Sequence, residues 1–168
     1  MSDILEQIIG LYDSGLTYQQ YIDAADLDIK DRHLYYLQAM RLNESEVNRA
    51  LKIKAVKLLV FCSSYCKDCR IVLSILENLH GVNPLLQYRI ADRVGNRDIM
   101  KEIDINCRIP LIIAISPSDF NLVYNEIPKS LYSTISGDLN DSQKEAIRKN
   151  YRKGLFKAEI MDELISKI

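Results

Sequence analysis

Three cysteines, Cys62, Cys66 and Cys69, fall within eight consecutive positions of this 168-residue chain, which has four cysteines in all. The Cys66-x-x-Cys69 spacing is suited to thiol–disulfide chemistry. Two thiols one helical turn apart can close into a disulfide and reopen, and the inner thiol can attack a mixed disulfide formed at the outer one. We therefore expect Cys66 to be the nucleophile and Cys69 the resolving thiol.

The elements around this pair predict where it lies. Residues 56–62 form a continuous apolar run, typical of a strand covered on both faces, and apolar residues return to helical spacing from about Cys66 until Gly81. Cys66 is thus expected in the first turn of a helix, where free backbone N–H groups and the helix dipole stabilise an anion and lower the pKa of a thiol. Lys67 adds a cation there and Asp68 an opposing charge, so both are expected to tune that pKa.

The rest of the chain predicts an α/β fold with a mixed four-stranded sheet. A strand–helix–strand unit implies a right-handed parallel crossover, and the later strand pair implies an antiparallel hairpin on the same sheet, in the order βαβα and then ββα. A proline suits the start of a strand, where Pro110 stands. The elements expected after the first strand and helix are a strand at 85–90, a helix at 97–104, strands at 111–115 and 121–125, and helices at 142–153 and 157–167.

The first fifty-odd residues are expected to contain only helices. Apolar residues repeat at helical spacing, and Thr17 and Asn43 can act as N-caps of two of the helices. We therefore divide the chain into a helical extension, residues 1–54, which packs on a single compact domain, residues 55–168.

Composition narrows the class of protein. Hydrophobic residues make up 48% of the chain, and 22 basic residues balance 23 acidic ones for a net charge of -1, whereas a general nucleic-acid binder usually has a strong basic excess. The sequence contains neither an apolar run near the roughly 18 residues of a membrane span nor a basic-then-apolar leader. We expect a cytoplasmic protein that binds neither nucleic acid nor membrane.

Two segments carry a resemblance to a known family. The stretch from Phe61 to Arg70 resembles the active-site segment of thioredoxins: an apolar strand, an aromatic residue (Tyr65) immediately before C-x-x-C, and a basic residue after it. Some forty residues later, Ile109-Pro110 followed by an apolar strand is similar to the family's second mark, an apolar residue and a cis-proline that face the dithiol. The resemblance covers roughly residues 55–130.

The resemblance implies a thioredoxin-like fold and a protein-disulfide oxidoreductase that needs no bound cofactor. It implies that Cys66 and Cys69 are catalytic, that Tyr65, Ile109 and Pro110 contact the disulfide substrate, and that the Ile109–Pro110 bond is cis. An electron donor, which the sequence does not identify, would restore the dithiol.

Three positions depart from the family pattern. Cys62 stands where many thioredoxins carry tryptophan, and Val60 stands where they keep a buried carboxylate that assists the second cysteine. Lys67-Asp68 replaces Gly-Pro between the two cysteines.

Other interpretations of the cysteines stay open at this point. Cys62-x-x-x-Cys66-x-x-Cys69 also has the spacing by which radical S-adenosylmethionine enzymes hold an iron–sulfur cluster. Adding Cys107 would give four ligands for zinc, although we expect that residue to be an ordinary loop cysteine and expect no metal. A binding or scaffold protein that keeps the fold without turnover is a further alternative.

Overall fold

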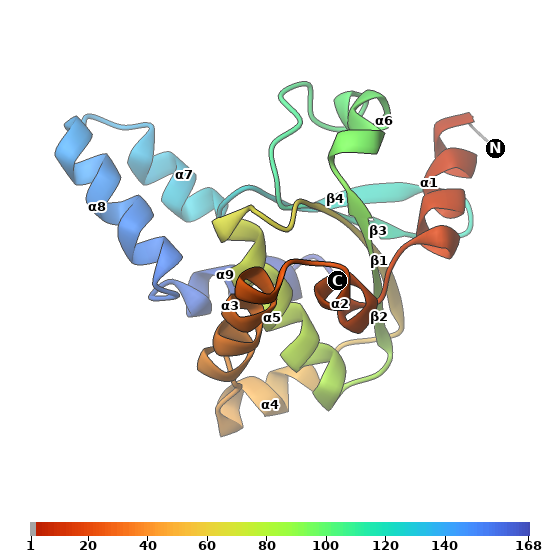
Figure 1. Ribbon diagram of the computed structural model, residues 1–168, viewed down its shortest axis with the longest axis horizontal. Helices are drawn as coiled ribbons and strands as arrows, with labels where there is room; N and C mark the ends of the chain where they lie inside the picture. The colour runs from red at the N-terminus through yellow and green to blue at the C-terminus, as the bar shows by residue number, and fades with distance from the viewer. Residues whose placement is uncertain (1–2) are drawn as a thin grey trace.

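The fold is built on one mixed sheet. The structure is a computed structural model that describes residues 3–168. Its strands are β1 (Val56–Cys62), β2 (Leu86–Asp92), β3 (Leu111–Ile115) and β4 (Phe120–Asn125), in the order β2-β1-β3-β4 (Figure 1). β1 pairs with β2 in parallel and with β3 antiparallel, and β4 pairs antiparallel with β3. The predicted α/β class and mixed four-stranded sheet are confirmed.

Helices account for most of the remaining described chain. Four of them precede the sheet, and the predicted N-caps Thr17 and Asn43 each form a capping box with the residue three positions later. The helices are α1 (Asp3–Ser14), α2 (Tyr18–Asp23), α3 (Leu27–Ala39), α4 (Glu44–Ala50), α5 (Lys67–Val82), α6 (Arg97–Lys101), α7 (Lys129–Ile135), α8 (Asp141–Arg152) and α9 (Lys157–Ile165), with a 3₁₀ turn at Val94–Asn96. In residues 3–168, none of them combines the length and the apolar character that a membrane crossing requires.

The alternation of side chains along β1 separates two cores. Leu58, Val60 and Cys62 point to the face covered by α5, and the buried residues of α2 and α9 belong to the same core. Leu59 and Phe61 point to the opposite face, where α1 and α6 pack (Figure 1). Both faces of β1 are therefore dry, which explains its continuous apolar sequence.

The chain passes from one face of the sheet to the other at Leu16. Between α1 and α2, the backbone of Leu16 exchanges two hydrogen bonds of 2.9 Å with Ile90 at the outer edge of β2. The space there is tight, because a Cβ added to Gly15 would lie 2.8 Å from Arg89 Cβ. This short antiparallel bridge attaches the beginning of the chain to the sheet.

Some element bounds differ from the expectation. β2 continues to Asp92, because its pairing with β1 extends as far as Cys62. α6 ends at Lys101, and the N–H groups of Ile103 and Asp104 both donate to the carbonyl of Met100 in the turn that follows. The predicted closing helices are confirmed as α8 and α9. The sequence did not predict helix α7, which the structure contains. This short, mostly polar helix after Pro128 is stabilised by the burial of Leu131 and Ile135.

Candidate active site around Cys66 and Cys69

Cys66 is the N-cap of α5 and lies between the carboxyl end of β1 and the first turn of the helix. Its backbone is extended, with φ -73° and ψ 115°, and its Sγ accepts a hydrogen bond from the backbone N–H of Cys69 at 3.2 Å. A sulfur atom thus fills the place that a serine, threonine or aspartate oxygen usually takes. Cys66 is partly exposed, whereas Cys69 is completely buried, so an approaching molecule would reach Cys66 first.

Cys69 lies within hydrogen-bonding reach of two other thiols. Its side chain interacts in this way with Cys66 and also with Cys62, the last residue of β1. Cys62 is completely buried and points to the same face of the sheet as α5. The three sulfur atoms therefore follow one another from the surface inward in the order Cys66, Cys69, Cys62.

The expectation of a lowered pKa at Cys66 is wrong for this reduced arrangement. The hydrogen bond with the Cys69 side chain and then burial raise the pKa of the Cys66 thiol, and the Asp68 carboxylate raises it further. The N–H of Cys69 acts in the opposite direction, as expected at a helix N-terminus, but its effect is smaller. Burial also raises the pKa values of Cys69 and Cys62.

Tyr21 of α2 contributes a polar atom to this core, and no local sequence pattern predicts that contribution. Its side chain is only 6% exposed, and its hydroxyl has no hydrogen-bond partner among the described residues. Burial raises the pKa of Tyr21, and the next largest contributions come from Cys62, Cys69 and Cys66. The phenol therefore belongs to the same core as the three thiols, although none of them is its hydrogen-bond partner.

The residues that flank the two cysteines interact with distant parts of the chain. Tyr65 is an exposed aromatic residue whose hydroxyl donates to Asp26 Oδ2 at 3.1 Å. Lys67 is exposed to solvent. Asp68 accepts from Nε of Arg152 in α8 at 3.2 Å. The N-terminal helices and α8 thus both contact the cysteine segment.

The second predicted segment lies beside the first. Phe61 pairs with Leu111, so the carboxyl end of β1 adjoins the amino end of β3, where Ile109 and Pro110 precede the strand. The Ile109–Pro110 peptide bond is cis, which confirms that expectation. Ile109 is partly buried and packs against both cores.

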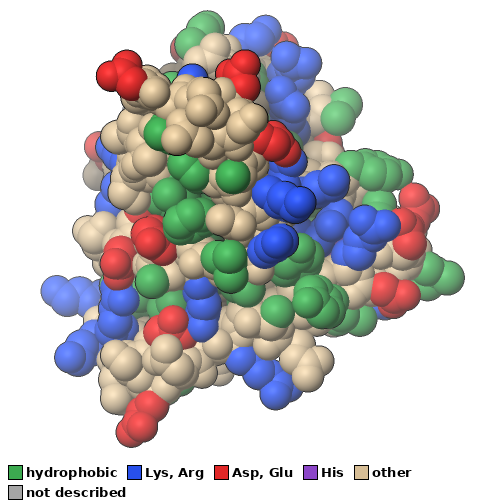
Figure 2. All heavy atoms as spheres, turned by 90° about the vertical axis from the view of Figure 1, so that its left-hand side faces the viewer, with side chains coloured by type: hydrophobic (Ala, Val, Ile, Leu, Met, Phe, Trp, Pro, Cys, Tyr) green, Lys and Arg blue, Asp and Glu red, His purple; other side chains and the backbone are tan. Residues whose placement is uncertain are grey.

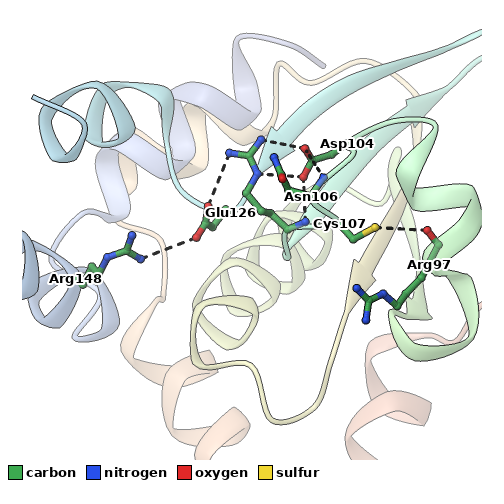
Figure 3. Close-up of polar contacts among 7 residues, drawn as sticks. Arg97, Asp104, Asn106, Cys107, Glu126 and Arg148 are labelled. Carbon is green, nitrogen blue, oxygen red and sulfur yellow. Dashed lines mark hydrogen bonds and ion pairs between the residues drawn. The ribbon is translucent and has the colours of Figure 1, made fainter.

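A network of charges holds the loop before Pro110 (Figure 3). Asp104 accepts hydrogen bonds from the backbone N–H, Nε and Nη2 of Arg108 at 2.9, 3.1 and 3.1 Å. Burial would raise the pKa of Asp104, but these bonds outweigh it and lower that pKa to about 2. Glu126 extends the network, with Arg108 and Arg148 each 3.9 Å from one of its carboxylate oxygens. The loop is therefore tied to α8 on one side and to its own aspartate on the other.

Cys107 is separate from the other three cysteines. Its thiol donates to the carbonyl of Arg97 at 3.4 Å (Figure 3). Its side chain packs with Phe61 and Leu111 in the core on the opposite face of the sheet. Four cysteines therefore do not converge as a zinc site would need. Over residues 3–168, no group of three or more His, Cys, Asp or Glu side chains is arranged to hold a metal ion.

Two hollows of the surface differ in size and in their position relative to the cysteine segment. A groove of about 540 Å³ lies at the other end of β1 and is lined by Lys54, Lys57 and Lys167 among others. A hollow beside Asp68 and Tyr151 has room for only about 10 Å³, too little for a small-molecule substrate. Basic side chains gather on the side of the molecule that carries α7 and α8 (Figure 2), and α8 itself contains Lys144, Arg148, Lys149 and Arg152.

Comparisons with known proteins agree with the fold. A family model described as "Thioredoxin" matches residues 15–145. A solved protein of unknown function from Pseudomonas aeruginosa is 19% identical, with a TM-score of 0.75 and 93% of each chain covered. An HIV epitope-scaffold protein is 18% identical, with a TM-score of 0.75 and 94% of each chain covered. None of the curated proteins matches the sequence.

Proposed function

The chain belongs to the thioredoxin family, and from that premise we propose that it is a thiol–disulfide oxidoreductase that works through Cys66 and Cys69. One observation carries the proposal: a partly exposed sulfur caps α5 directly above a buried second sulfur, with the N–H of Cys69 donated to Cys66 Sγ at 3.2 Å. That N–H stabilises negative charge on Cys66 whenever the thiol loses its proton.

The reaction proceeds in two exchanges. The Cys66 thiolate attacks one sulfur of a substrate disulfide, forms a mixed disulfide and releases the other substrate sulfur as a thiolate, which takes up a proton. Cys69 then loses its proton and attacks Cys66 Sγ, which releases the second substrate thiol and closes the Cys66–Cys69 disulfide. Two electrons pass to the substrate, and an external dithiol reductant restores the pair.

The small size of the hollow beside Asp68 favours a protein or peptide disulfide over an enclosed small molecule. A hollow of about 10 Å³ beside Asp68 has no room for a small ligand. A peptide, by contrast, could lie across exposed Tyr65 and partly buried Ile109. In this proposal the backbone of Ile109 pairs with the extended substrate segment, as the family resemblance implies.

The thiol environment supports a reducing role. Strong protein oxidants owe their potential to a reduced form stabilised as thiolate. Here the Cys69 side chain and burial raise the pKa of Cys66, so the reduced pair lacks that stabilisation and favours giving up its electrons. The same raised pKa favours one second candidate, a binding protein that keeps the fold without turnover, because little thiolate would be present near neutral pH.

The deciding experiment is insulin reduction with dithiothreitol as the electron source. We expect the wild type to accelerate insulin precipitation, Cys66→Ser to abolish the acceleration, and Cys69→Ser to accumulate a mixed disulfide at Cys66. Cys107→Ala is the matched control, because Cys107 packs in the core on the other face of the sheet. A wild type no faster than Cys66→Ser would favour the binding protein.

A further inference from the structure

The strongest unassigned feature is the buried thiol at the end of β1. We propose that Cys62 is a third redox-active cysteine, which exchanges with the Cys66–Cys69 disulfide to form a buried Cys62–Cys69 disulfide and to free Cys66. The inference rests on the proposed function, because its starting state is the oxidised pair. It gives the protein two oxidised forms, one with the disulfide near the surface and one with the disulfide in the core.

The position of Cys69 supports the exchange. Cys69 is the only one of these three cysteines whose side chain lies within hydrogen-bonding reach of both others in the described structure. Cys62 and Cys69 are both completely buried in the core on the α5 face. The alternation along β1 directs Cys62 toward α5 together with Leu58 and Val60. An attacking sulfur, a central sulfur and a leaving sulfur are thus already neighbours in the required order.

The exchange conserves electrons. Cys62 loses its proton, and its sulfur attacks Cys69 Sγ of the Cys66–Cys69 disulfide. The Cys62–Cys69 bond forms as the Cys66–Cys69 bond breaks, and Cys66 leaves as a thiolate that takes up a proton. Because one disulfide replaces another, the step needs neither an oxidant nor a reductant. In the reduced protein the Cys69 N–H donates to Cys66 Sγ at 3.2 Å, and the same bond would stabilise the Cys66 thiolate as it leaves.

Tyr21 places a hydroxyl group in the core where this step would take place. Its hydroxyl is buried, has no hydrogen-bond partner among the described residues, and lies close enough to all three cysteines for each to affect its ionisation. A buried polar group without a partner carries a cost of about 1–3 kcal/mol, and a hydrogen bond to a transient thiolate would remove that cost during the exchange. Tyr21 is therefore a positioning residue, and Tyr21→Phe should slow the exchange without changing its end point.

Peptide mapping of the oxidised wild-type protein tests the proposal. The protein is oxidised with oxidised dithiothreitol, quenched in acid, alkylated and digested with trypsin, which separates Cys69 from a peptide that runs from Leu58 to Lys67 and contains both other cysteines. Fragment ions from that peptide show whether Cys62 or Cys66 carries the alkyl group. We expect on the order of a tenth or more of the linked molecules to carry it on Cys66, which corresponds to exchange within about tenfold of balance.

Two variants sharpen the result. Cys66→Ser should still close a disulfide between Cys62 and Cys69, and Cys62→Ala should leave no alkylated Cys66 in the oxidised protein. The inference fails if the linked wild type carries the alkyl group on Cys62 alone, or if Cys62 and Cys69 of Cys66→Ser both stay alkylatable under conditions that oxidise the wild type. A Cys62–Cys66 bond would also overturn it. Insulin reduction by the wild type reports on the proposed function separately, because it requires only Cys66 and Cys69.

Discussion

The hydroxyl of Tyr65 donates a hydrogen bond to Asp26 Oδ2 at 3.1 Å, across 39 positions of the chain. Tyr65 immediately precedes Cys66, and Asp26 is the N-cap of α3. The bond therefore joins the N-terminal helices to the segment that carries the nucleophile. The N-terminal helices thus reach the candidate active site itself.

The Tyr65–Asp26 contact can be detected by titration. The hydrogen bond to the Asp26 carboxylate, together with its negative charge, raises the pKa of Tyr65 above its usual value. Asp26→Asn should return that pKa toward about 10, the usual value for tyrosine. The tyrosinate absorbance of each protein, after subtraction of the matching Tyr65→Phe spectrum, isolates Tyr65. Identical titrations with and without the Asp26 carboxylate would show that the contact is not made in solution.

The reactivity of Cys66 should continue to increase at pH values where an ordinary thiol is already fully ionised. Because the Cys69 side chain and burial raise its pKa, the thiolate fraction, and with it the rate of alkylation by iodoacetamide, should rise about tenfold per pH unit through pH 9. Cys69→Ala removes the largest cause and should speed alkylation near pH 8, whereas Cys107→Ala should leave the rate unchanged. A plateau already reached below pH 8 in the wild type would contradict the raised pKa.

His33 should make the protein sensitive to acid. It is completely buried, its ring nitrogens have no partners among the described residues, and it packs edge-on against Tyr18 and Tyr21. Burial, and to a lesser extent the charge of Arg70, lower the pKa of His33 to about 4.

The sign of the His33 effect follows from proton uptake. Between about pH 6.5 and 4, His33 is protonated in the unfolded chain but stays neutral in the folded protein. The free energy of unfolding therefore falls by about 3 kcal/mol as the pH decreases over this interval. His33→Phe keeps a ring in place and should remove most of this slope in urea unfolding at a series of pH values. A variant with the same slope as the wild type would assign the acid sensitivity to other groups.

The ionised Asp104 carboxylate should stabilise the loop before Pro110 at pH values above about 4, the usual pKa of an aspartate. Its pKa is lowered to about 2, so the stabilisation is complete above about pH 4 and is lost as the pH falls toward 2. Asp104→Asn should therefore cost about 2 kcal/mol at pH 7 in denaturant unfolding, and much less near pH 2. Asp98→Asn is the matched control, because its ion pair with Lys101 is exposed and should change stability little. Equal effects of the two substitutions would count against the network.

The sequence predicted the sheet because the signals for it are local. The apolar run of β1, the helical spacing after Cys66 and the proline before β3 each act over a few residues, and all three elements are confirmed. α7 was missed because only Leu131 and Ile135 mark its buried side, four positions apart in a polar segment. Their spacing is a helical signal, but two residues are too few to separate a helix from a loop.

The environment of the site depends on contacts that no local pattern encodes. Arg152 reaches Asp68 across 84 positions, and Tyr21 of α2 approaches the three thiols from the N-terminal part of the chain. The helix N-terminus correctly predicted an N–H directed at Cys66, but the larger opposing effects of Cys69 and burial arise from tertiary packing. The position of Cys66 at the start of α5 could therefore be predicted from local sequence, whereas the direction of its pKa shift could not.

The bridge between Leu16 and Ile90 also protects the protein from self-association. An outer strand with free N–H and C=O groups is a template onto which a second molecule can add a strand of its own, the first step toward fibrous aggregates. Leu16 uses both backbone groups of Ile90 in the middle of β2, so a neighbouring chain cannot align along the full length of that strand. Loss of this one contact would leave a longer stretch of unpaired backbone at the edge of the sheet, to which another chain could bind.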